Sequence, residues 1–375
     1  MQKTGRLDSL VENRGMSLHL GIPKPFEIDP TWMTSALRAS DTADGTAAVS
    51  RLTCTPIGSG QMGESFRFDL EWVGDGATGA PLPTTVVGKF ASSDPNSREA
   101  GRMGAYAKEI GFYRELQSKA NVPSPVPYYV AFDGESADFV VLMSDLAPAE
   151  QGDQIAGCNL NEATRAVHAI AGLHASTWGQ TDELGSFEWL PPRSSDYVSL
   201  HAQLYRALFD GFAAEYGAAI GPEDIDLGRW VGENYERLLN AHRLPMCVVH
   251  NDFRLDNVMF TDSSVSVVDW QTLSVGFGPV DVAYFVGAGM VPPPTDAEER
   301  GLVKSYAMRL GELGVAADET ELWRSYRLGS VSGYIMAVIA SQLVVRTPRG
   351  MEMFRAMASR HAQQMRRVGF ADAIE

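Results

Sequence analysis

A short segment of the chain combines residue types that suit the transfer of a phosphoryl group. It reads VVHNDFRLDNVMF and holds Asp252 and, five residues later, Asn257. Asp269 follows twelve residues after Asn257, at the end of a second apolar run. Phosphoryl transfer needs a carboxylate that accepts the hydroxyl proton, and an amide and a second carboxylate that hold Mg²⁺ against the phosphates. We therefore predict that Asp252 is catalytic and that Asn257 and Asp269 bind the metal.

A glycine pattern, GSGQMG, places Gly58, Gly60 and Gly63 in the order GxGxxG. Dinucleotide-binding folds and kinase folds both use this pattern, so the element that follows it must distinguish them. A dinucleotide site needs a helix there, whereas residues 65–72 alternate without a fault between apolar and polar side chains, as a half-buried strand does. A glycine turn between strands favours a kinase-type flap over the phosphates of ATP and disfavours a nicotinamide-dependent oxidoreductase. An ordinary glycine-rich hairpin is the alternative for this motif taken alone.

A lysine, Lys89, lies near the end of the apolar run 84–90. Lysines are seldom buried unless they are paired. In a kinase such a lysine holds the α- and β-phosphates and pairs with a glutamate of the next helix. We expect that helix over residues 98–117, where Glu109 is the best partner because aromatic residues flank it on the inward face. The alternative is an edge-strand lysine that points to solvent.

The order of the elements predicts an α+β fold with two lobes, a small β-rich N-lobe and a large, mainly helical C-lobe. Strand patterns dominate from about residue 47 to a stop at Ser144-Asp145, and helical patterns dominate from about residue 159, apart from a strand-rich island at 246–270. The predicted domains are an N-terminal arm and helix (1–44, the helix starting at Asp29-Pro30), a nucleotide-binding N-lobe (45–145) and a catalytic, acceptor-binding C-lobe (146–375).

Composition excludes several classes of partner and location. The 375 residues include 47 acids against 31 lysines and arginines, a net charge of −16, which argues against a nucleic acid or a membrane surface as partner. The three cysteines are too few and too far apart for a disulfide framework or a zinc knuckle. The N-terminus lacks an apolar signal region, and no apolar run is long enough to span a bilayer. We expect a soluble, cytoplasmic protein, and the oligomeric state stays open.

Taken together, these motifs resemble those of the aminoglycoside phosphotransferase/choline kinase superfamily, whose members share a protein-kinase-like fold. The nearest branch is that of the ecdysteroid-kinase-like, or CHK-type, proteins. The resemblance covers roughly residues 45–345. Besides the motifs above, it rests on the segments KEIGFY, VLMSDL, LHASTW and DWQTLSVGFGPVDVAYF.

The resemblance implies an ATP- and Mg²⁺-dependent kinase that phosphorylates a hydroxyl group of a small molecule, with the active site between the lobes. ATP would bind to the backbone of Met143 to Asp145, and Asp281 would brace the catalytic loop. Asn251 stands where the phosphotransferases usually have glycine. Choline-kinase relatives also carry asparagine at this position. Asp-Trp-Gln replaces the Asp-Phe-Gly of protein kinases and no Ala-Pro-Glu follows, so protein substrates are not expected.

A catalytically silent pseudokinase, acting as a nucleotide-binding regulator or scaffold, is the alternative from a different class. The presence of Lys89, Asp252, Asn257 and Asp269 argues against it, because a protein that only binds nucleotide has no need for the base.

The distribution of charge bears on the acceptor. Residues 149–290 hold 7 basic against 19 acidic residues, whereas residues 291–375 hold 11 against 10. The acidity therefore falls on the segment that carries Asp252 and on the divergent part where the resemblance places the acceptor. An anionic acceptor would approach against this field. We predict a neutral or cationic hydroxyl compound, unless these acids are merely solvated surface groups.

Overall fold

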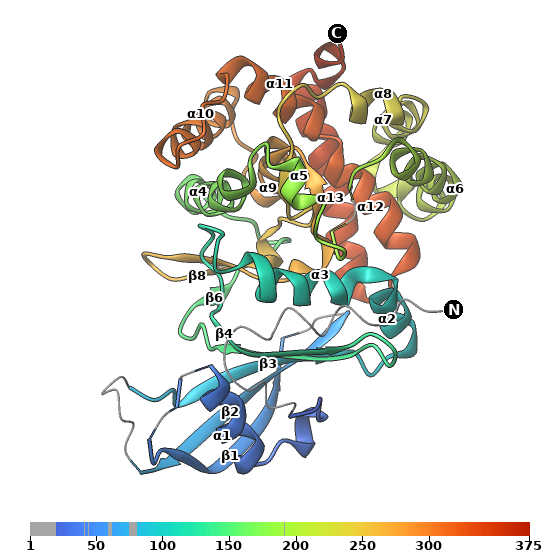
Figure 1. Cartoon of the computed structure of the whole chain (residues 1–375). Coiled ribbons are helices and arrows are strands. Elements are labelled where there is room, and N and C mark those ends of the chain that lie inside the picture. Colours follow the sequence, from blue (N-terminus) through green and yellow to red (C-terminus); the bar gives the residue numbers. More distant parts are fainter. Residues whose placement is uncertain (1–19, 41, 44, 59–61, 75–80, 191) are drawn as a thin grey trace. The chain divides into compact units, whose positions relative to one another are not determined.

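The computed structural model describes residues 20–375 except 41, 44, 59–61, 75–80 and 191 (Figure 1). The chain divides into two compact units. The first comprises Met1–Ile110 and Val126–Asp145, and the second comprises Gly111–Pro125 and Leu146–Glu375. The first is rich in strands and the second is mainly helical, which confirms the predicted α+β, two-lobed fold.

The first unit is built on a five-stranded antiparallel sheet in the order β1-β2-β3-β5-β4. Its strands are β1 (Ala48–Ile57), β2 (Gly63–Val73), β3 (Thr85–Ala91), β4 (Pro127–Asp133) and β5 (Asp138–Ser144). The alternating segment lies within β2, whose Phe66 and Phe68 point into the core while Arg67 is on the other face. The glycine pattern therefore connects two antiparallel strands, as predicted, and no helix follows it.

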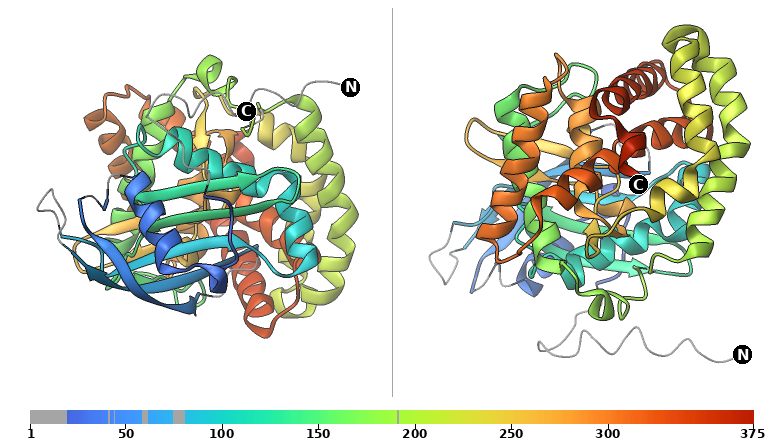
Figure 2. Two further views of the ribbon diagram at one scale, coloured as in Figure 1. Left: turned by 60° about the horizontal axis from the view of Figure 1, so that its bottom comes forward. Right: turned by 90° about the horizontal axis from the view of Figure 1, so that it is seen from above.

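Helix α1 (Pro30–Ala39) begins as the sequence indicates. The carboxylate of Asp29 accepts the backbone N–H of Trp32 at 2.7 Å, and Pro30 takes the first helical position. Met33 and Leu37 of this helix are fully buried in the same core as the apolar face of the sheet. The helix thus covers one face of the sheet (Figure 2), and Lys89 lies on the other face.

The single helix expected over 98–117 is wrong. The chain forms α2 (Pro95–Ala100), a wider helical turn (Gly101–Ala105), α3 (Tyr106–Gly111) and a second wide turn (Phe112–Leu116). Gly104 breaks the regular helix because its φ of 116° lies in a region that residues other than glycine rarely adopt. Two helical pieces with different directions replace one continuous helix.

The second unit is a helical assembly around helix α9 (Gly278–Gly289), in which every residue except Val280 is buried. The other helices are α4 (Leu160–Thr177), α5 (Thr181–Leu184), α6 (Ser195–Ile220), α7 (Pro222–Glu233), α8 (Tyr235–Asn240), α10 (Asp296–Glu312), α11 (Glu319–Gly329), α12 (Ser332–Leu343) and α13 (Pro348–Val368). Across the described residues, no helix is both long and apolar enough to cross a membrane.

Short strands carry the sequence motifs of the second unit. They are β6 (Glu150–Gln151), β7 (Cys247–Val249), β8 (Val258–Phe260), β9 (Val265–Val267) and β10 (Ser274–Gly276). β7 pairs with β10, and β8 lies between β6 and β9. The predicted strand-rich island is therefore present, and it supports the loop that holds Asp252.

Candidate active site

Lys89 and Glu109 form a buried ion pair in the first unit. The Nζ of Lys89 lies 2.5 Å from a carboxylate oxygen of Glu109, and the two side chains are 13% and 1% exposed. β3 lies between β2 and β5, so Lys89 is not on an edge strand and that alternative is wrong. Breaking a buried ion pair by removing one partner typically costs about 3–5 kcal/mol. The role of this pair toward a nucleotide stays a prediction.

The glycine pattern frames the junction of β1 and β2. Gly58 follows β1 with a φ of 72°, which suits glycine, and Gly63 starts β2 opposite Ala91 of β3. Gly60 lies outside the described residues. The pattern therefore sits at the same end of the sheet as the last residues of β3.

Met143 and Asp145 lie at the end of β5. Met143 is buried, and the carboxylate of Asp145 binds the Nε and an Nη of Arg67 on β2, at 2.7 and 3.1 Å. This hydrogen bond raises the pKa of Arg67. The ion pair fixes the segment whose backbone is predicted to bind the nucleotide.

Three donors hold the carboxylate of Asp252 in the second unit. The Nε of Arg254 lies 3.1 Å from both oxygens, the hydroxyl of Tyr284 donates at 2.8 Å to Oδ1, and the amide nitrogen of Asn257 donates at 2.9 Å to Oδ2. The side chain is 20% exposed. Asp252 is therefore an oriented carboxylate with limited access to solvent, as a catalytic base requires.

Asp281 braces the loop in front of Asp252, as the resemblance implies. Its carboxylate is fully buried and accepts the backbone N–H groups of His250 and Asn251 at 2.6 and 2.9 Å. His174 of α4 lies 3.1 Å from the same carboxylate. A buried carboxylate with three donors is well satisfied, and it fixes the backbone of the loop from behind.

The structure explains why asparagine can stand at position 251. Asn251 has a φ of 62°, in the left-handed region that glycine and asparagine tolerate best. Its amide nitrogen donates to the carbonyl of Thr272 at 2.9 Å and to the hydroxyl of Ser274 at 2.6 Å. Asn251 therefore keeps the backbone shape that glycine allows and adds a tie to the segment that follows Asp269.

Asn257 and Asp269 flank one end of the β8–β9 hairpin. Val258 pairs with Val267, and the N–H of Val268 donates to the carbonyl of Asn257 at 3.0 Å, which brings the two candidate ligands to neighbouring positions. Asp269 has a φ of 68°, a strained value for a residue other than glycine and one that often marks a functional site. Trp270, the next residue, stacks on Phe112 at a ring distance of 3.8 Å and anchors this segment.

The donor set fits Mg²⁺. Asn257 and Asp269 offer oxygen atoms, the ligand type that Mg²⁺ prefers, and Mg²⁺ is commonly held by one or two carboxylates together with substrate phosphates. Within the described residues, no group of three histidines, cysteines or acids could hold a metal on its own. The arrangement suits a metal that binds together with a nucleotide.

Comparison with known proteins identifies the family. The model of the APH phosphotransferase enzyme family matches residues 72–320, about two thirds of the chain. The chain belongs to this family. Among curated proteins, none matches the sequence.

Solved structures with the same fold include phosphotransferases of small molecules. Choline kinase from Cryptosporidium parvum is 9% identical with a TM-score of 0.55, and the match covers 87% of this chain and 92% of that one. Ethanolamine kinase from Plasmodium vivax is 14% identical with a TM-score of 0.51, and the match covers 82% and 81%. At such identities the likeness shows the fold alone. The predicted superfamily is confirmed, and the ecdysteroid-kinase-like branch stays a prediction.

Two donors to the carboxylate of Asp252, Arg254 and Tyr284, were not predicted from the sequence. Arg254 also binds Asp256, which in turn binds Arg349 of α13 at 2.9 and 3.2 Å. Although burial opposes the effect, Asp252 and Asp256 raise the pKa of Arg254. An arginine placed between two acids at alternate positions was the signal for this network. No sequence pattern near Asp252 indicated Tyr284, which lies 32 residues away along the chain.

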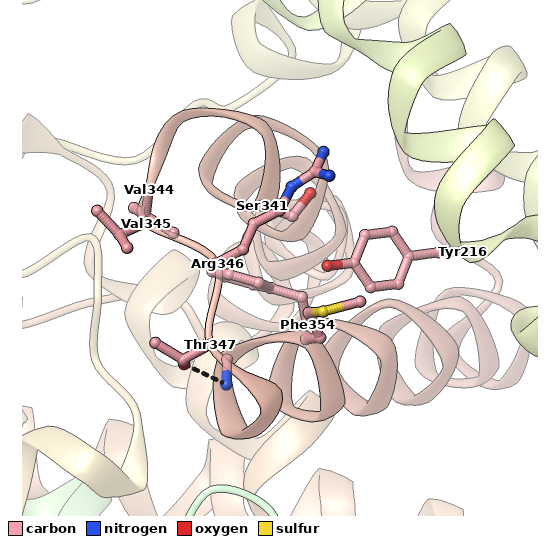
Figure 3. A pocket seen from close by; sticks show the side chains of 9 residues that line it. Tyr216, Ser341, Val344, Val345, Arg346, Thr347 and Phe354 are labelled. Atoms are coloured by element: carbon pink, nitrogen blue, oxygen red, sulfur yellow. Dashed lines mark hydrogen bonds between the residues drawn. The ribbon is translucent and has the colours of Figure 1, made fainter.

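A small cavity of the second unit lies apart from these residues. It lies among α6, α12 and α13, with Tyr216, Arg346 and Phe354 in its lining (Figure 3). The N-terminus of α13 borders it, where the hydroxyl of Thr347 accepts the N–H of Gly350 at 3.0 Å. None of the predicted site residues lines this cavity, so it is not assigned to the reaction.

Proposed function

We propose that the protein transfers the γ-phosphoryl group of ATP to a hydroxyl group of a small molecule. The observation that carries the proposal is the carboxylate of Asp252, which is oriented by Arg254, Tyr284 and Asn257 on a loop braced by Asp281. The acceptor oxygen attacks the γ-phosphorus, its proton passes to Asp252, and the bond to ADP breaks.

The other predicted residues have distinct parts in this proposal. Lys89, held by Glu109, binds the α- and β-phosphates, and the backbone of the glycine pattern lies against them. The backbone from Met143 to Asp145 binds the base of the nucleotide. Asn257 and Asp269 hold Mg²⁺, which when bound offsets the charge of the phosphates.

The acceptor is expected to be neutral or cationic. The net charge of −12 over residues 149–290 supports this choice, because an anion would meet a repulsive field. Choline and ethanolamine, the substrates named for the structural relatives, are small cationic alcohols and belong in the first panel.

ADP release is the direct test. Wild-type protein with MgATP is incubated with neutral, cationic and anionic alcohols at low and at physiological salt, and Lys89→Met serves as the impaired variant. We expect release that depends on a neutral or cationic alcohol and falls at least tenfold in the variant. Tight ATP binding with no ADP release, whether an alcohol is present or water is the only acceptor, would favour the pseudokinase. Preferred turnover of an anionic alcohol would refute the assignment of the acceptor.

A further inference from the structure

The hydroxyl of Tyr106 lies where three elements of the first unit meet. It donates to the backbone carbonyl of Met62 at 2.8 Å and accepts the backbone N–H of Ser92 at 3.1 Å. Met62 is the fifth residue of the glycine pattern and directly precedes β2, while Ser92 directly follows β3. One side chain therefore joins the glycine pattern to the strand that carries Lys89.

The spacing of these residues makes two successive links between the same strand and helix. Ser92 comes three residues after Lys89, and Tyr106 comes three residues before Glu109, so Tyr106 and Glu109 share one face of α3. The Lys89–Glu109 ion pair is one link, and the Ser92–Tyr106 hydrogen bond is the other. The second link also reaches Met62.

The surroundings of Tyr106 hold its ring in one place. The side chain is fully buried, and its ring lies 4.7 Å from the ring of Phe139 on β5. A Cβ atom at Gly101 would lie 2.2 Å from the ring, so glycine at that position makes room for it. Burial raises the pKa of Tyr106, which keeps the phenol protonated and able to donate to Met62.

We propose that Tyr106 is a positioning residue for the phosphates of ATP, acting through Met62 and Ser92 on the glycine pattern and on Lys89. The inference rests on the proposed function, since it assumes that this sheet end receives the phosphates. A glycine-rich turn binds phosphates through backbone N–H groups, whose direction depends on how the turn is anchored. The hydrogen bond from Tyr106 supplies that anchor.

The test is Tyr106→Phe, which keeps the ring and removes both hydrogen bonds of the hydroxyl. We expect the Kd of ATP and of ADP to rise about five- to tenfold, the effect of one or two net hydrogen bonds. The Kd of adenosine, which has no phosphates, should stay within about twofold, and KM for ATP should rise more than kcat falls. Tyr128→Phe on β4 removes a hydroxyl that takes no part in these links and should bind ATP as the wild type does.

Three results would overturn the inference. The first is wild-type affinity for ATP in Tyr106→Phe. The second is an equal loss of affinity for ATP and for adenosine in this variant, as expected of a purely structural residue. Wild-type protein that binds neither ATP nor ADP would overturn the proposed function as well. If the variant does not fold, hydrogen exchange of the wild type decides: the Ser92 amide should exchange at least tenfold more slowly than an unprotected peptide amide, and equal rates would contradict the anchor.

Discussion

At the scale of single residues, three side chains hold the carboxylate of Asp252 in place. A carboxylate has about four acceptor positions, and here both oxygens share one N–H of Arg254 while Tyr284 and Asn257 each donate to one oxygen, which leaves a position for the substrate hydroxyl. Such a group cannot rotate freely. The acceptor hydroxyl must therefore meet a carboxylate of fixed direction, which is the entropic advantage of a preorganised base.

Tyr284→Phe tests this fixation. The hydroxyl of Tyr284 is buried, and its loss leaves Arg254 as the remaining donor to Oδ1 of Asp252. We expect kcat to fall about tenfold, with KM for ATP within about twofold and stability lowered by about 1–3 kcal/mol. Steady-state kinetics and urea unfolding measure the two effects. Tyr205→Phe, which removes a buried hydroxyl bonded to the Gly228 carbonyl, is the control and should leave kcat unchanged. Equal kcat values for wild type and Tyr284→Phe would contradict the role.

At the scale of elements, the catalytic loop depends on one backbone conformation. Asn251 occupies the left-handed region, and the fully buried Asp281 holds the N–H groups of His250 and Asn251. The shape of the loop is therefore fixed by the backbone at position 251 and by the acid behind it. The side chain of Asn251 adds two hydrogen bonds to this arrangement.

Substitutions at position 251 separate these contributions. Asn251→Gly keeps the conformation and should retain kcat within about fivefold, since only the two side-chain bonds are lost. Asn251→Val places a β-branched side chain at positive φ and should reduce kcat at least tenfold and lower stability by about 1–3 kcal/mol. Kinetics and thermal unfolding of both variants provide the comparison. If the valine variant were as active as the glycine variant, the backbone argument would fail.

The elements also show where sequence reasoning reached its limit. The alternation of residues 65–72 predicted β2 because burial on one face of a sheet follows a period of two. The break in the helix at Gly104 was missed, because an isolated glycine in a helical pattern is often tolerated and only the φ of 116° reveals its role. Local patterns predict periodic elements well and special backbone conformations poorly.

At the scale of the whole molecule, the motif residues could be predicted but their supporting partners could not. Asp252 and Asn257 stand at a fixed spacing along the chain, and that spacing follows from the chemistry. Tyr284 and Arg349 reach the same loop from α9 and α13, which are distant in sequence. Contacts of this kind depend on how helices pack, and no local pattern encodes them.

Buried histidines give the molecule a predictable response to acid. Burial lowers the pKa of His361 to about 4, from an ordinary value near 6.5. Above pH 6.5 the side chain of His361 is neutral in both the folded and the unfolded state, so its titration does not change the free energy of unfolding. As the pH falls from about 6.5 to 4, the unfolded state binds a proton that the folded state does not, so stability falls by up to about 1.4 kcal/mol per pH unit.

Urea unfolding at pH 7 and pH 5 measures this response. Wild type should lose about 1–2 kcal/mol more than His361→Gln between these values, because the variant lacks the titrating group. His201→Gln, which removes a histidine of α6, serves as the control and should behave as the wild type does. Identical losses in wild type and His361→Gln would contradict the assignment.

We propose Asp252 as the base in phosphoryl transfer, and Asp252→Asn measured beside Asp262→Asn tests this role most directly. Asp262 is an exposed aspartate between β8 and β9, so its variant controls for the loss of one negative charge. With MgATP and the preferred alcohol of the panel, kcat of Asp252→Asn should fall by about 10² or more while the Kd of ATP stays within about threefold. Asp262→Asn should match the wild type. An Asp252→Asn variant with near wild-type kcat would contradict the account.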